Sequence, residues 1–561
     1  MRILREIPPK QKAGEYVAVD IEIFAAEEHL LHLPITGRFA SLQIALTNGD
    51  VYVITDEKDV QPALDAISKC MWVLMKGQFD IAHLRRWANV PDRELLIDIM
   101  YVDKIIWSGY FENFAFSLVD MARRYLDLYL DKDIREQFNT ATELSEEMLN
   151  YAATDALLTL RIAEKQRNFL TKDQYELIWQ DIDLPATWAF LASKPFRIDR
   201  DAWEQLAIRN KTKQEEINAT LDFNPGSWVQ VKEKLRKCGF KDLPSTGEEV
   251  LQEYITKYPD TEAARLAELV LESRMYGKRA STYGMKFIER HLFQEGDYWV
   301  MKPDYFTIGA ETGRVSCSGL HQIPIRDTKD FRDCFLAREG NKLVIADYSS
   351  QEPRIAAYLS QDQEYIRVMN SGEDIYTEAT FHLYESREEA IANRKNNKDI
   401  VLGTTYGLTK YGLARKWGLS VDNAEQFIAG FFARFPKLHR FLNGLSKKTN
   451  YVNTAVGRKI WLNKYSSQCA NNAQNGPHQG TAADMIKRAV AVCYKEWKPR
   501  WGAWALVECV HDEIGFDVPE KYANEVADWV RGKMIQVGQE MCAGVTFEVS
   551  VTVCDRWSES K

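Results

Sequence analysis

The first third of the chain has the hydrophobic pattern of a sheet covered by helices. Residues 15–24, EYVAVDIEIF, alternate apolar and polar positions and are rich in β-branched side chains, which predicts a strand. Residues 41–55 contain two more strand-like runs joined by Asn48-Gly49, a two-residue hairpin signal. A helical stretch near 60–69 and a short apolar strand at 71–75 follow. This β-β-β-α-β order predicts a mixed sheet with helices packed on it.

The middle of the chain changes to a helical period from about Leu184. Residues 223–240 and 266–284 are the clearest helical stretches, and the second carries Arg274, Lys278 and Arg279 among apolar positions. Cations at such positions are typical of a solvated helix face, and also of a surface that contacts phosphates. The pattern alone leaves both interpretations open.

Two predicted strands in the last half end in carboxylates. VIADYSSQEPRIAAYLS (344–360) begins as an apolar strand and reaches Asp347, with Glu352 and Arg354 close behind. ALVECV and IGFDV, within 505–518, predict two strands that meet at a tight turn formed by His511-Asp512-Glu513. Two strands of one sheet that each present an aspartate form a candidate two-metal site.

Carboxylates also recur in the first third, where the predicted sheet would expose them at one end. Asp20 and Glu22 lie two apart on one strand and share a face. Asp80 follows the 71–75 strand, and Tyr151 and Asp155 share a face of a helix that Ser145 would cap. Four hard oxygen ligands suit Mg²⁺ or Mn²⁺, and a pair of such ions suits phosphodiester cleavage.

A four-residue spacing marks one further helix. Arg394, Lys398, Leu402 and Tyr406 recur every fourth position, so they form a slowly curving stripe of two cations, an apolar side chain and an aromatic ring. The cationic end suits a triphosphate, and the other end suits a base and sugar.

Composition narrows the class without deciding it. The chain has 561 residues, 45% hydrophobic and 27% charged, as expected of a globular protein with several domains. The net charge of −9 argues against a uniformly basic nucleic-acid binder and allows a local basic groove. Nine dispersed cysteines without a C-x-x-C pair indicate reduced thiols. No secretory signal and no apolar run of about 18 residues is present, so we expect no membrane partner.

The carboxylate motifs of the first third resemble a known nuclease family. VDIE, QFDIAHL and YAATD are similar to the three motifs of the DEDD-type 3′→5′ proofreading exonucleases, in their tyrosine-bearing variant. The resemblance implies an RNase H-like domain over residues 1–175, with two Mg²⁺ ions held by Asp20, Glu22, Asp80 and Asp155, and with Tyr151 as a catalytic residue. The family usually has Asn where this chain has Lys76, which affects strand binding more than metal binding.

The remaining motifs resemble family A DNA polymerases, the DNA polymerase I type. TGRVS, DYS-x-x-E-x-R, R-x3-K-x7-YG, P-x-QGTAAD and VHDE occur in the family's order, after FN-x-GS and PST-x-EEVL. The resemblance implies an α/β multidomain protein whose residues 176–561 form a right-hand polymerase domain. We expect a helical thumb at about 200–300, a palm with an antiparallel sheet at about 301–360 and 470–561, and helical fingers at about 361–469.

The same resemblance implies roles for individual residues. Asp347 and Asp512 are expected to bind two catalytic Mg²⁺ ions, or Mn²⁺, with Glu513 and Lys398 also in the catalytic set. Glu352 is expected to be the steric gate that excludes a ribose 2′-hydroxyl. The other residues expected to contact the nucleotide are Arg394, Lys398, Leu402, Tyr406, Gln351 and His511. Those expected to contact primer–template DNA are Arg314, Asn475, Gln479, Arg354, Arg274 and Lys278.

Two departures from the family pattern affect the polymerase motifs. The usual DYSQIELR is DYSSQEPR here, so Ser350, Gln351 and Pro353 surround an unchanged Glu352. Leu402 replaces an aromatic residue that the family uses to sense the 3′ side of the sugar, and Val401 replaces the Asn before it. We therefore expect poor incorporation of dideoxynucleotides.

The function expected from these motifs is template-directed, primer-dependent DNA synthesis with 3′→5′ proofreading during DNA replication, by two-metal phosphoryl transfer. Expected partners are primer–template DNA, dNTPs and replisome accessory proteins, for a monomer in the cytoplasm of a bacterial host cell or in an organelle matrix. No 5′-nuclease motif precedes the exonuclease, as in phage or organelle members or a truncated bacterial enzyme. One alternative, a single-subunit RNA polymerase, is disfavoured by Glu352. Another, a nuclease or DNA-binding protein with an inactive polymerase half, is disfavoured by intact Asp347 and Asp512.

Overall fold

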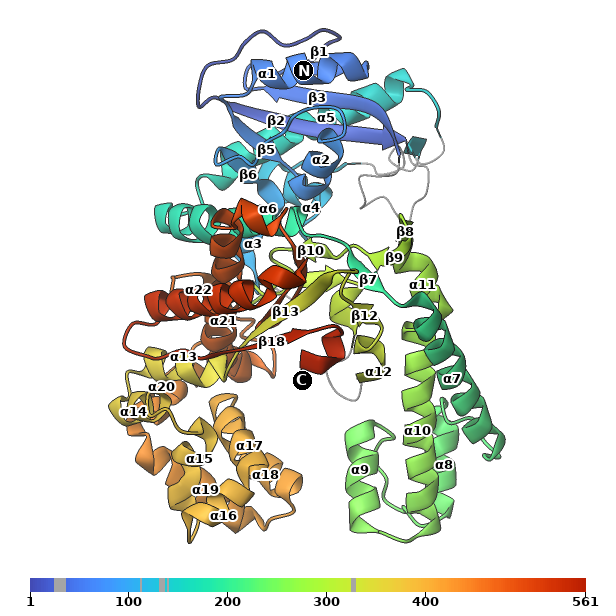
Figure 1. Cartoon of the computed structure of the whole chain (residues 1–561), viewed down its shortest axis with the longest axis vertical. Coiled ribbons are helices and arrows are strands. Elements are labelled where there is room, and N and C mark those ends of the chain that lie inside the picture. Colours follow the sequence, from blue (N-terminus) through green and yellow to red (C-terminus); the bar gives the residue numbers. More distant parts are fainter. Residues whose placement is uncertain (25–36, 111–113, 131–136, 139–140, 324–328, 561) are drawn as a thin grey trace. The chain divides into compact units, whose positions relative to one another are not determined.

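The computed structural model describes residues 1–24, 37–110, 114–130, 137–138, 141–323 and 329–560. The chain forms two compact units (Figure 1). The first contains residues 1–194, 303–318 and 344–553, and the second contains residues 195–302, 319–343 and 554–561. Each unit is therefore assembled from segments that are distant in the sequence.

A six-stranded mixed sheet forms the N-terminal part of the first unit. Its order is β1-β4-β3-β2-β5-β6, with β2, β3 and β4 antiparallel and the β1–β4, β2–β5 and β5–β6 pairs parallel. The predicted β-β-β-α-β order is confirmed, including the hairpin at Asn48-Gly49. The strands are β1 (Arg2–Leu4), β2 (Tyr16–Phe24), β3 (Arg38–Leu46), β4 (Asp50–Ile54), β5 (Met71–Leu74) and β6 (Leu96–Asp98).

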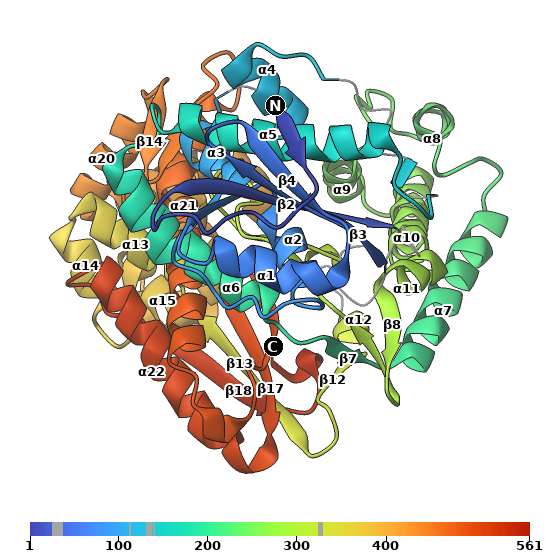
Figure 2. The same ribbon diagram turned by 90° about the horizontal axis from the view of Figure 1, so that it is seen from above.

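Helices cover both faces of this sheet because its strands are apolar on both sides. Val17, Val19 and Ile21 pack on one face, and Ala18 packs on the other against Ala153 of α5. Figure 2 shows α5 lying across β2, β3 and β4. As predicted, Ser145 caps α5 by accepting a hydrogen bond from the N–H of Met148. The helices are α1 (Val60–Ala66), α2 (Gly77–Leu84), α3 (Ile99–Trp107), α4 (Leu118–Leu126) and α5 (Glu146–Gln166).

The C-terminal part of the first unit is built on a second sheet of order β16-β17-β13-β18. The predicted strand that reaches Asp347 and the predicted acidic hairpin are both present as neighbours in it. Long helices α21 and α22 pack against each other beside the sheet. The elements are β13 (Asn341–Tyr348), β16 (Leu506–Val510), β17 (Glu513–Pro519), β18 (Val549–Cys554), α13 (Gln351–Ser360), α21 (Cys469–Lys495) and α22 (Ala523–Met541).

The segment expected to form the fingers is helical, as predicted, and ends in a short hairpin. Its helices are α14 (Gln363–Met369), α15 (Ile375–Thr380), α16 (Arg387–Ala392), α17 (Arg394–Thr405), α18 (Lys410–Trp417), α19 (Val421–Arg434) and α20 (Pro436–Ser446). Strands β14 (Tyr451–Asn453) and β15 (Lys459–Trp461) form the hairpin, which precedes α21. A further two-stranded ribbon pairs β10 (Asp304–Phe306) with β11 (Ser316–Ser318).

The second unit contains the predicted helical arm and a small sheet of order β12-β7-β9-β8. Figure 1 shows α7 and α10 side by side. The ring of Trp203 in α7 stacks on that of Phe287 in α11, which helps to join these two helices. The elements are β7 (Phe196–Ile198), α7 (Arg200–Ala219), α8 (Trp228–Lys237), α9 (Glu248–Lys257), α10 (Glu262–Thr282), α11 (Met285–His291), β8 (Leu292–Glu295), β9 (Tyr298–Met301), α12 (Lys329–Arg332) and β12 (Phe335–Leu336).

Within the first unit, a continuous helical segment crosses the expected domain boundary near residue 175. A π-helical stretch (Gln174–Asp183) continues directly into α6 (Leu184–Leu191). At their junction, buried Asp183 pairs with Arg458 and with Lys487, and both cations also pair with Asp484. Two acids and two bases compensate one another, which is what makes burial of four charges tolerable.

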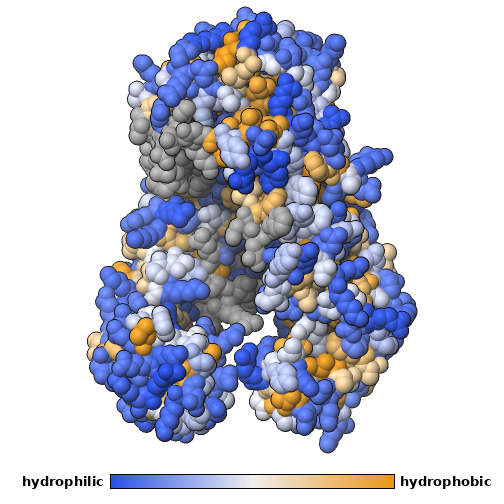
Figure 3. All heavy atoms as spheres, turned by 180° about the vertical axis from the view of Figure 1, so that it is seen from behind, coloured by the Kyte–Doolittle hydropathy of each residue, from blue (hydrophilic) through white to orange (hydrophobic). Residues whose placement is uncertain are grey.

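The face of the molecule drawn in Figure 3 is predominantly polar. In the view of Figure 3, hydrophilic side chains cover most of the face and apolar side chains appear in scattered patches. Among the helices of the described ranges, none combines the length and the apolar character needed to cross a membrane.

Candidate active sites

The strand ends bring Asp347 and Asp512 next to each other. The N–H of Tyr348, at the end of β13, donates a hydrogen bond to the carbonyl of Asp512 at 3.2 Å. Asp512 lies in the two-residue turn between β16 and β17, whose closing pair is Val510 and Glu513. The preceding turn residue, His511, has a left-handed φ of 59°. Both aspartates are half-buried, whereas Glu513 is 1% exposed.

Glu352 lies in the first turn of α13, close to Asp347 in the chain, and forms an ion pair with Arg314. The distance from Arg314 Nη2 to Glu352 Oε1 is 2.8 Å, and the Glu352 side chain is 16% exposed. Burial raises the pKa of Glu352, and the Arg314 guanidinium opposes that shift. The expected steric gate and an expected primer–template contact are thus joined in one pair.

The unusual neighbours of Glu352 each have a defined place. The Ser350 hydroxyl is 2.9 Å from that of Tyr376, and Gln351 Nε2 donates to the carbonyl of Ala482 in α21 at 3.4 Å. Pro353 occupies the third position of α13, where a backbone N–H has no helical partner to lose. Substitution at these positions therefore leaves the helix that carries Glu352 intact.

The predicted stripe on α17 is present. Arg394 and Lys398 are exposed, Leu402 and Tyr406 are half-buried, and Ile400, Val401 and Thr404 form the buried face of the helix. Tyr406 is the residue that ends α17. Gly407 follows with a φ of +78°, where an added Cβ would lie 2.5 Å from Gln474 Oε1 of α21.

One buried aromatic ring lies beneath both cations of the stripe. The guanidinium carbon of Arg394 is 5.4 Å from the ring centroid of Tyr376, and Lys398 Nζ is 5.7 Å from it. Tyr376 is 5% exposed, and burial raises the pKa of its hydroxyl. Arg394 also pairs with Asp374 at 2.7 Å. Tyr376 and Asp374 were not predicted, because no local pattern in DIYTEAT indicates contact with a helix 20 residues away.

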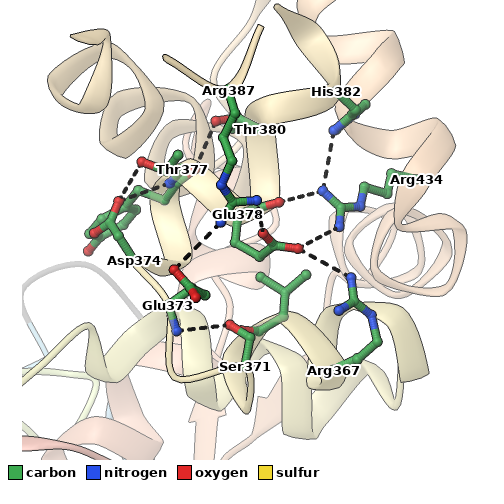
Figure 4. Close-up of polar contacts among 12 residues, drawn as sticks. Arg367, Ser371, Glu373, Asp374, Thr377, Glu378, Thr380, His382, Arg387 and Arg434 are labelled. Carbon is green, nitrogen blue, oxygen red and sulfur yellow. Dashed lines mark hydrogen bonds and ion pairs between the residues drawn. The ribbon is translucent and has the colours of Figure 1, made fainter. Parts of the chain in front are cut away.

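A buried carboxylate organises the helices around this ring (Figure 4). Glu378 of α15 is 7% exposed and accepts hydrogen bonds from Arg367 at 3.3 Å, Arg387 at 3.1 Å and Arg434 at 3.4 Å. In the same view, Asp374 caps α15 by accepting from the N–H and hydroxyl of Thr377. Three cations from three helices therefore converge on α15, the helix that carries Tyr376.

For two residues, Arg354 and Gln351, burial of the side chain contradicts the contact that we expected. Arg354 is 1% exposed; its guanidinium donates to the carbonyl of Met369 at 2.7 Å and pairs with Glu548 at 3.0 Å, so it is not available to DNA. Gln351 is 4% exposed and directed at α21, so it does not present its amide to a nucleotide. Both side chains hold α13 in place instead.

The other expected DNA contacts differ in how far they are available. Asn475 and Gln479 are half-buried on α21, four residues apart and so on one face. Lys278 is exposed on α10. Arg274 is half-buried and donates to the carbonyls of Pro225, at 2.8 Å, and Thr246, which ties loops of the second unit together.

The elements that carry the N-terminal carboxylates contact one another at β2. Asp20 and Glu22 are half-buried on the strand face covered by α5, the helix that carries Tyr151 and Asp155. Asp80 of α2 accepts a hydrogen bond at 3.1 Å from the N–H of Ile21, which lies between Asp20 and Glu22. Tyr151 packs against an apolar cluster that includes Phe24 and Met148. Elements α2 and α5, which carry Asp80 and Asp155, therefore both contact the strand that carries Asp20 and Glu22.

The turn before Asp80 depends on a residue that was not predicted. Asp98 is buried and accepts hydrogen bonds from the N–H groups of Lys76, at 3.3 Å, and Gly77, at 2.7 Å. Lys76 has a left-handed φ of 60°, a conformation that Asn adopts more easily than Lys. The Lys76 ammonium lies 4.9 Å from the ring centroid of Phe306. Asp98 and this cation–π contact therefore hold the strained turn.

Both carboxylate sets have the donor chemistry of magnesium sites. Burial, reinforced by nearby Asp98, raises the pKa of Asp80 to about 8, and a divalent cation beside it would favour the charged form. Carboxylate oxygens are the ligands that Mg²⁺ and Mn²⁺ prefer. Across the described segments, no group of three or more His, Cys, Asp or Glu side chains is already arranged around one metal position. The metal assignments therefore stay predictions.

Comparison with known proteins gives a consistent family. The sequence matches DNA polymerase family A over residues 199–559 and the 3′-5′ exonuclease family over residues 3–171. DNA polymerase I of Aquifex aeolicus is 26% identical over 544 residues, which cover 91% of each chain. DNA polymerase I of Chloroflexus aurantiacus is 28% identical over 460 residues, or 76% of this chain. The chain spans 48% of that second relative's length.

A solved structure agrees in fold. The POL domain of Pol1 from M. smegmatis, solved in complex with DNA primer-template and dNTP, aligns with a TM-score of 0.80 over 98% of this chain and 96% of its own, at 22% identity. A family match over well more than half of the chain, preceded by the exonuclease match, identifies the architecture. The chain belongs to DNA polymerase family A and carries a 3′-5′ exonuclease domain ahead of its polymerase domain.

Proposed function

We propose that this protein is a template-directed, primer-dependent DNA polymerase that also removes nucleotides from the primer 3′ end. The observation that carries the proposal is the hydrogen bond from Tyr348 to Asp512, which brings Asp347 and Asp512 together at the ends of two neighbouring strands. Two adjacent carboxylates at strand ends, close in the chain to Ser350, which bonds to the tyrosine beneath Arg394 and Lys398, suit the transfer of a nucleotide to a primer hydroxyl.

The residues around this pair have complementary tasks. Asp347 and Asp512 would hold two Mg²⁺ ions, which when bound supply positive charge to the phosphate oxygens and lower the pKa of the primer 3′-hydroxyl. Arg394 and Lys398, exposed on α17, would neutralise the incoming triphosphate. His511 and Glu513 flank Asp512. His511 would lie near the primer terminus, and Glu513 would belong to the metal-binding turn. Charge placement and positioning account for most of the catalysis in such reactions.

Sugar selection would depend on Glu352. Its carboxylate is held by Arg314 at 2.8 Å, so the volume that it occupies near the nucleotide sugar is fixed. A ribose 2′-hydroxyl would compete for that space. Asn475 and Gln479, four residues apart on α21, would contact the primer–template, and Tyr406 would lie near the templating pair.

The exonuclease activity would use the N-terminal carboxylates. Asp20, Glu22, Asp80 and Asp155 would hold the ions, and the Tyr151 hydroxyl would orient the attacking water. The match to the 3′-5′ exonuclease family over residues 3–171 supports this second activity, and the relatives cited above, which are called DNA polymerase I, support the first. We place the protein in DNA replication in a bacterial cytoplasm, acting as a monomer on primer–template DNA and dNTPs, with accessory proteins of the replisome as further partners.

Primer extension with separated activities tests the proposal. A labelled primer on a template is incubated with Mg²⁺ and either dNTPs or rNTPs. Asp512→Asn should abolish extension and leave 3′-end degradation intact, and Asp20→Ala should do the reverse. If Asp512→Asn extended the primer at the wild-type rate, the polymerase site would be elsewhere. If rNTPs were used as well as dNTPs, the role given to Glu352 would be wrong.

A further inference from the structure

A long stretch of the chain is free of acidic residues. Residues 426–483 contain no Asp or Glu, whereas the whole chain has 81 acids against 72 Lys and Arg. The same stretch contains eight Lys or Arg residues. It covers most of α19, α20, the β14–β15 hairpin and the first half of α21. A local positive region is therefore built into a protein of net charge −9.

Most of these cations face solvent without an acidic partner. Lys447, Lys448 and Lys464 are exposed, and Lys459 is half-buried. In the parts of the chain that the structure describes, none of these four lysines forms an ion pair. Cations that balance the charge of an acidic side chain within the protein would form such ion pairs, as Arg458 does with Asp183. These lysines are therefore available to an external anion.

The hairpin sorts its side chains onto two faces. Its register pairs Tyr451 with Trp461 and Asn453 with Lys459, and side chains directly opposite each other share a face. The alternate residues Val452 and Ile460 point the other way into an apolar cluster with Ala473 of α21. The hairpin surface, defined as Tyr451, Asn453, Lys459 and Trp461 with the following Lys464 and Tyr465, therefore carries rings and cations on a supported base.

Aromatic rings on this surface are exposed and interleaved with ammonium groups. Tyr451 is 37% exposed and Tyr465 is 82% exposed. Lys459 Nζ lies 4.8 Å from the ring centroid of Tyr451 and 5.0 Å from that of Trp461. Lys464 Nζ lies 5.0 Å from the centroid of Tyr465. Flat rings beside cations are the combination on which unpaired bases stack while the phosphates between them are neutralised.

Contacts with α21 hold the side of the hairpin that faces away from the hairpin surface. Thr454 and Arg458, which bound the hairpin turn, both bond to Asp484 of α21, at 2.9 Å and 2.7 Å. α21 has Gly476 and Gly480 where the hairpin crosses it; a Cβ at Gly480 would lie 2.5 Å from Thr454 Cγ2. A ligand would thus find the hairpin already ordered, which reduces the entropic cost of binding.

The same hairpin is joined to the exonuclease domain within the first unit. The N–H of Trp461 donates to the carbonyl of Ser108 at 3.0 Å, and its indole N–H donates to that of Ile106 at 2.7 Å. Gly109, with a φ of +84°, permits this approach, because an added Cβ would lie 2.4 Å from the Trp461 carbonyl oxygen. Tyr110, 36% exposed, places its ring edge-on to Trp461 at 4.9 Å. The row of rings therefore continues onto the exonuclease domain.

We propose that the hairpin surface is a binding site for single-stranded DNA, on which unpaired bases stack against Tyr451 and Tyr465 while Lys459 and Lys464 contact the phosphates. This inference rests on the proposed function, which supplies the unpaired strand. Because the surface bridges α21 and the exonuclease domain, the bound strand would contact both domains. Duplex DNA, whose bases are already stacked, would gain little from it.

Fluorescence anisotropy with the full-length protein tests the site. The probe is a labelled oligo-dT of about 16 nucleotides, the upper site size of single-stranded-DNA folds, in EDTA so that it is not degraded. Tyr451→Ala combined with Tyr465→Ala should weaken its binding by about tenfold or more, whereas the corresponding Phe substitutions should keep the wild-type Kd, because stacking needs only the ring. Tyr129→Ala, which removes a tyrosine that is 81% exposed elsewhere, is the matched control and should change nothing.

The salt dependence of oligo-dT binding provides a second test of the site. Lys459→Gln with Lys464→Gln should reduce the slope of log Kd against log salt concentration by about 1.4, since each lost phosphate contact on a single strand removes about 0.7. Lys165→Gln, an exposed lysine of α5, is the control. A Kd for oligo-dT within about twofold of wild type in the tyrosine double variant, where stacking predicts far more, would overturn the proposal. Equal loss on blunt duplex DNA would overturn it too, because the site would then not select single strands.

The assay separates this inference from the proposed function. Primer extension by the wild-type protein is measured in parallel, and its failure would count against the polymerase assignment. Binding of oligo-dT needs no catalysis, so the anisotropy result would still decide the role of the hairpin surface. Unchanged thermal unfolding of the variants, expected for substitutions at exposed positions, excludes misfolding as the cause of weakened binding.

Discussion

Removing the Tyr376 hydroxyl should weaken binding of the incoming nucleotide without disturbing the fold. Tyr376 bonds to Ser350 at 2.9 Å and lies beneath Arg394 and Lys398, so it links the end of β13 to the helix that would bind the triphosphate. Tyr376→Phe keeps the ring and deletes only the bond. A hydrogen bond of this kind is worth about 0.5–1.5 kcal/mol, which corresponds to a rise of about 2–13-fold in the Kd for dNTP if the ring loses its position.

Truncation to Ala should have a larger effect, because it also removes both cation–π contacts. Each is worth about 0.5–1 kcal/mol at an exposed cation, which adds about 1–2 kcal/mol to the loss. The Kd for dNTP should therefore rise further, while the rate of the chemical step at saturating dNTP changes less. Single-turnover incorporation of one nucleotide, measured over a range of dNTP concentrations, separates the two quantities.

A double-mutant cycle tests whether Ser350 and Tyr376 act through each other. Ser350→Ala and Tyr376→Phe each delete the same bond, so the double variant should be no worse than either single variant. Tyr384→Phe is the matched control, because Tyr384 bonds to Asn397 on the buried face of α17 at 2.6 Å and should show no coupling to Ser350. Additive effects of Ser350→Ala and Tyr376→Phe on the Kd for dNTP would refute the link.

Three further predictions concern other parts of the molecule. Leu402 carries no hydroxyl and no ring, so we expect dideoxynucleotides to be incorporated much less efficiently than deoxynucleotides; equal efficiencies in single-nucleotide assays would contradict this. Arg458→Met leaves the buried carboxylates of Asp183 and Asp484 with one cation, so urea unfolding should show a loss of about 3–5 kcal/mol, whereas an unchanged midpoint would exclude a structural role for the cluster. The raised pKa of Asp80, about 8 when folded against 3.8 for a free side chain, means that the folded state binds the extra proton, so without metal stability should fall as pH rises from about 4 to 8. Asp80→Asn should flatten this fall in thermal unfolding measured in EDTA; an equally steep fall would show that Asp80 is not its source.

Local patterns predicted the elements that carry the chemistry. Alternation and the Asn48-Gly49 turn located the antiparallel strands β2, β3 and β4, and Ser145 located the start of α5. The acidic hairpin at Asp512 was predicted because both its strands are predominantly apolar, although each contains one acid, Glu508 or Asp517. The short strands β1 and β6 were missed, since three residues are too few to show a period.

Contacts between distant segments could not be predicted in the same way. Arg354 lies two residues from Glu352 in the sequence, yet its guanidinium bonds to Met369 at the end of α14 and to Glu548, which directly precedes β18. The pairing of Asp183 with Lys487 joins residues that are 304 positions apart. No local sequence pattern indicates these pairs, because each buried charge is tolerated in the interior only through the ion pair that it forms with a distant residue.

The unusual sequence around Glu352 forms a consistent set. A motif that changed three of eight residues would be expected to weaken the helix or to displace the gate. Instead, Ser350 bonds to Tyr376, Gln351 bonds to the backbone of α21, and Pro353 occupies a position where its missing N–H costs nothing. Glu352 itself is held by Arg314. Ser350 and Gln351 therefore anchor the start of α13, which carries the gate, to α15 on one side and to α21 on the other. It follows that exchanging Ser350 alone should alter nucleotide affinity, whereas discrimination between dNTP and rNTP should change only when Glu352 or Arg314 is replaced.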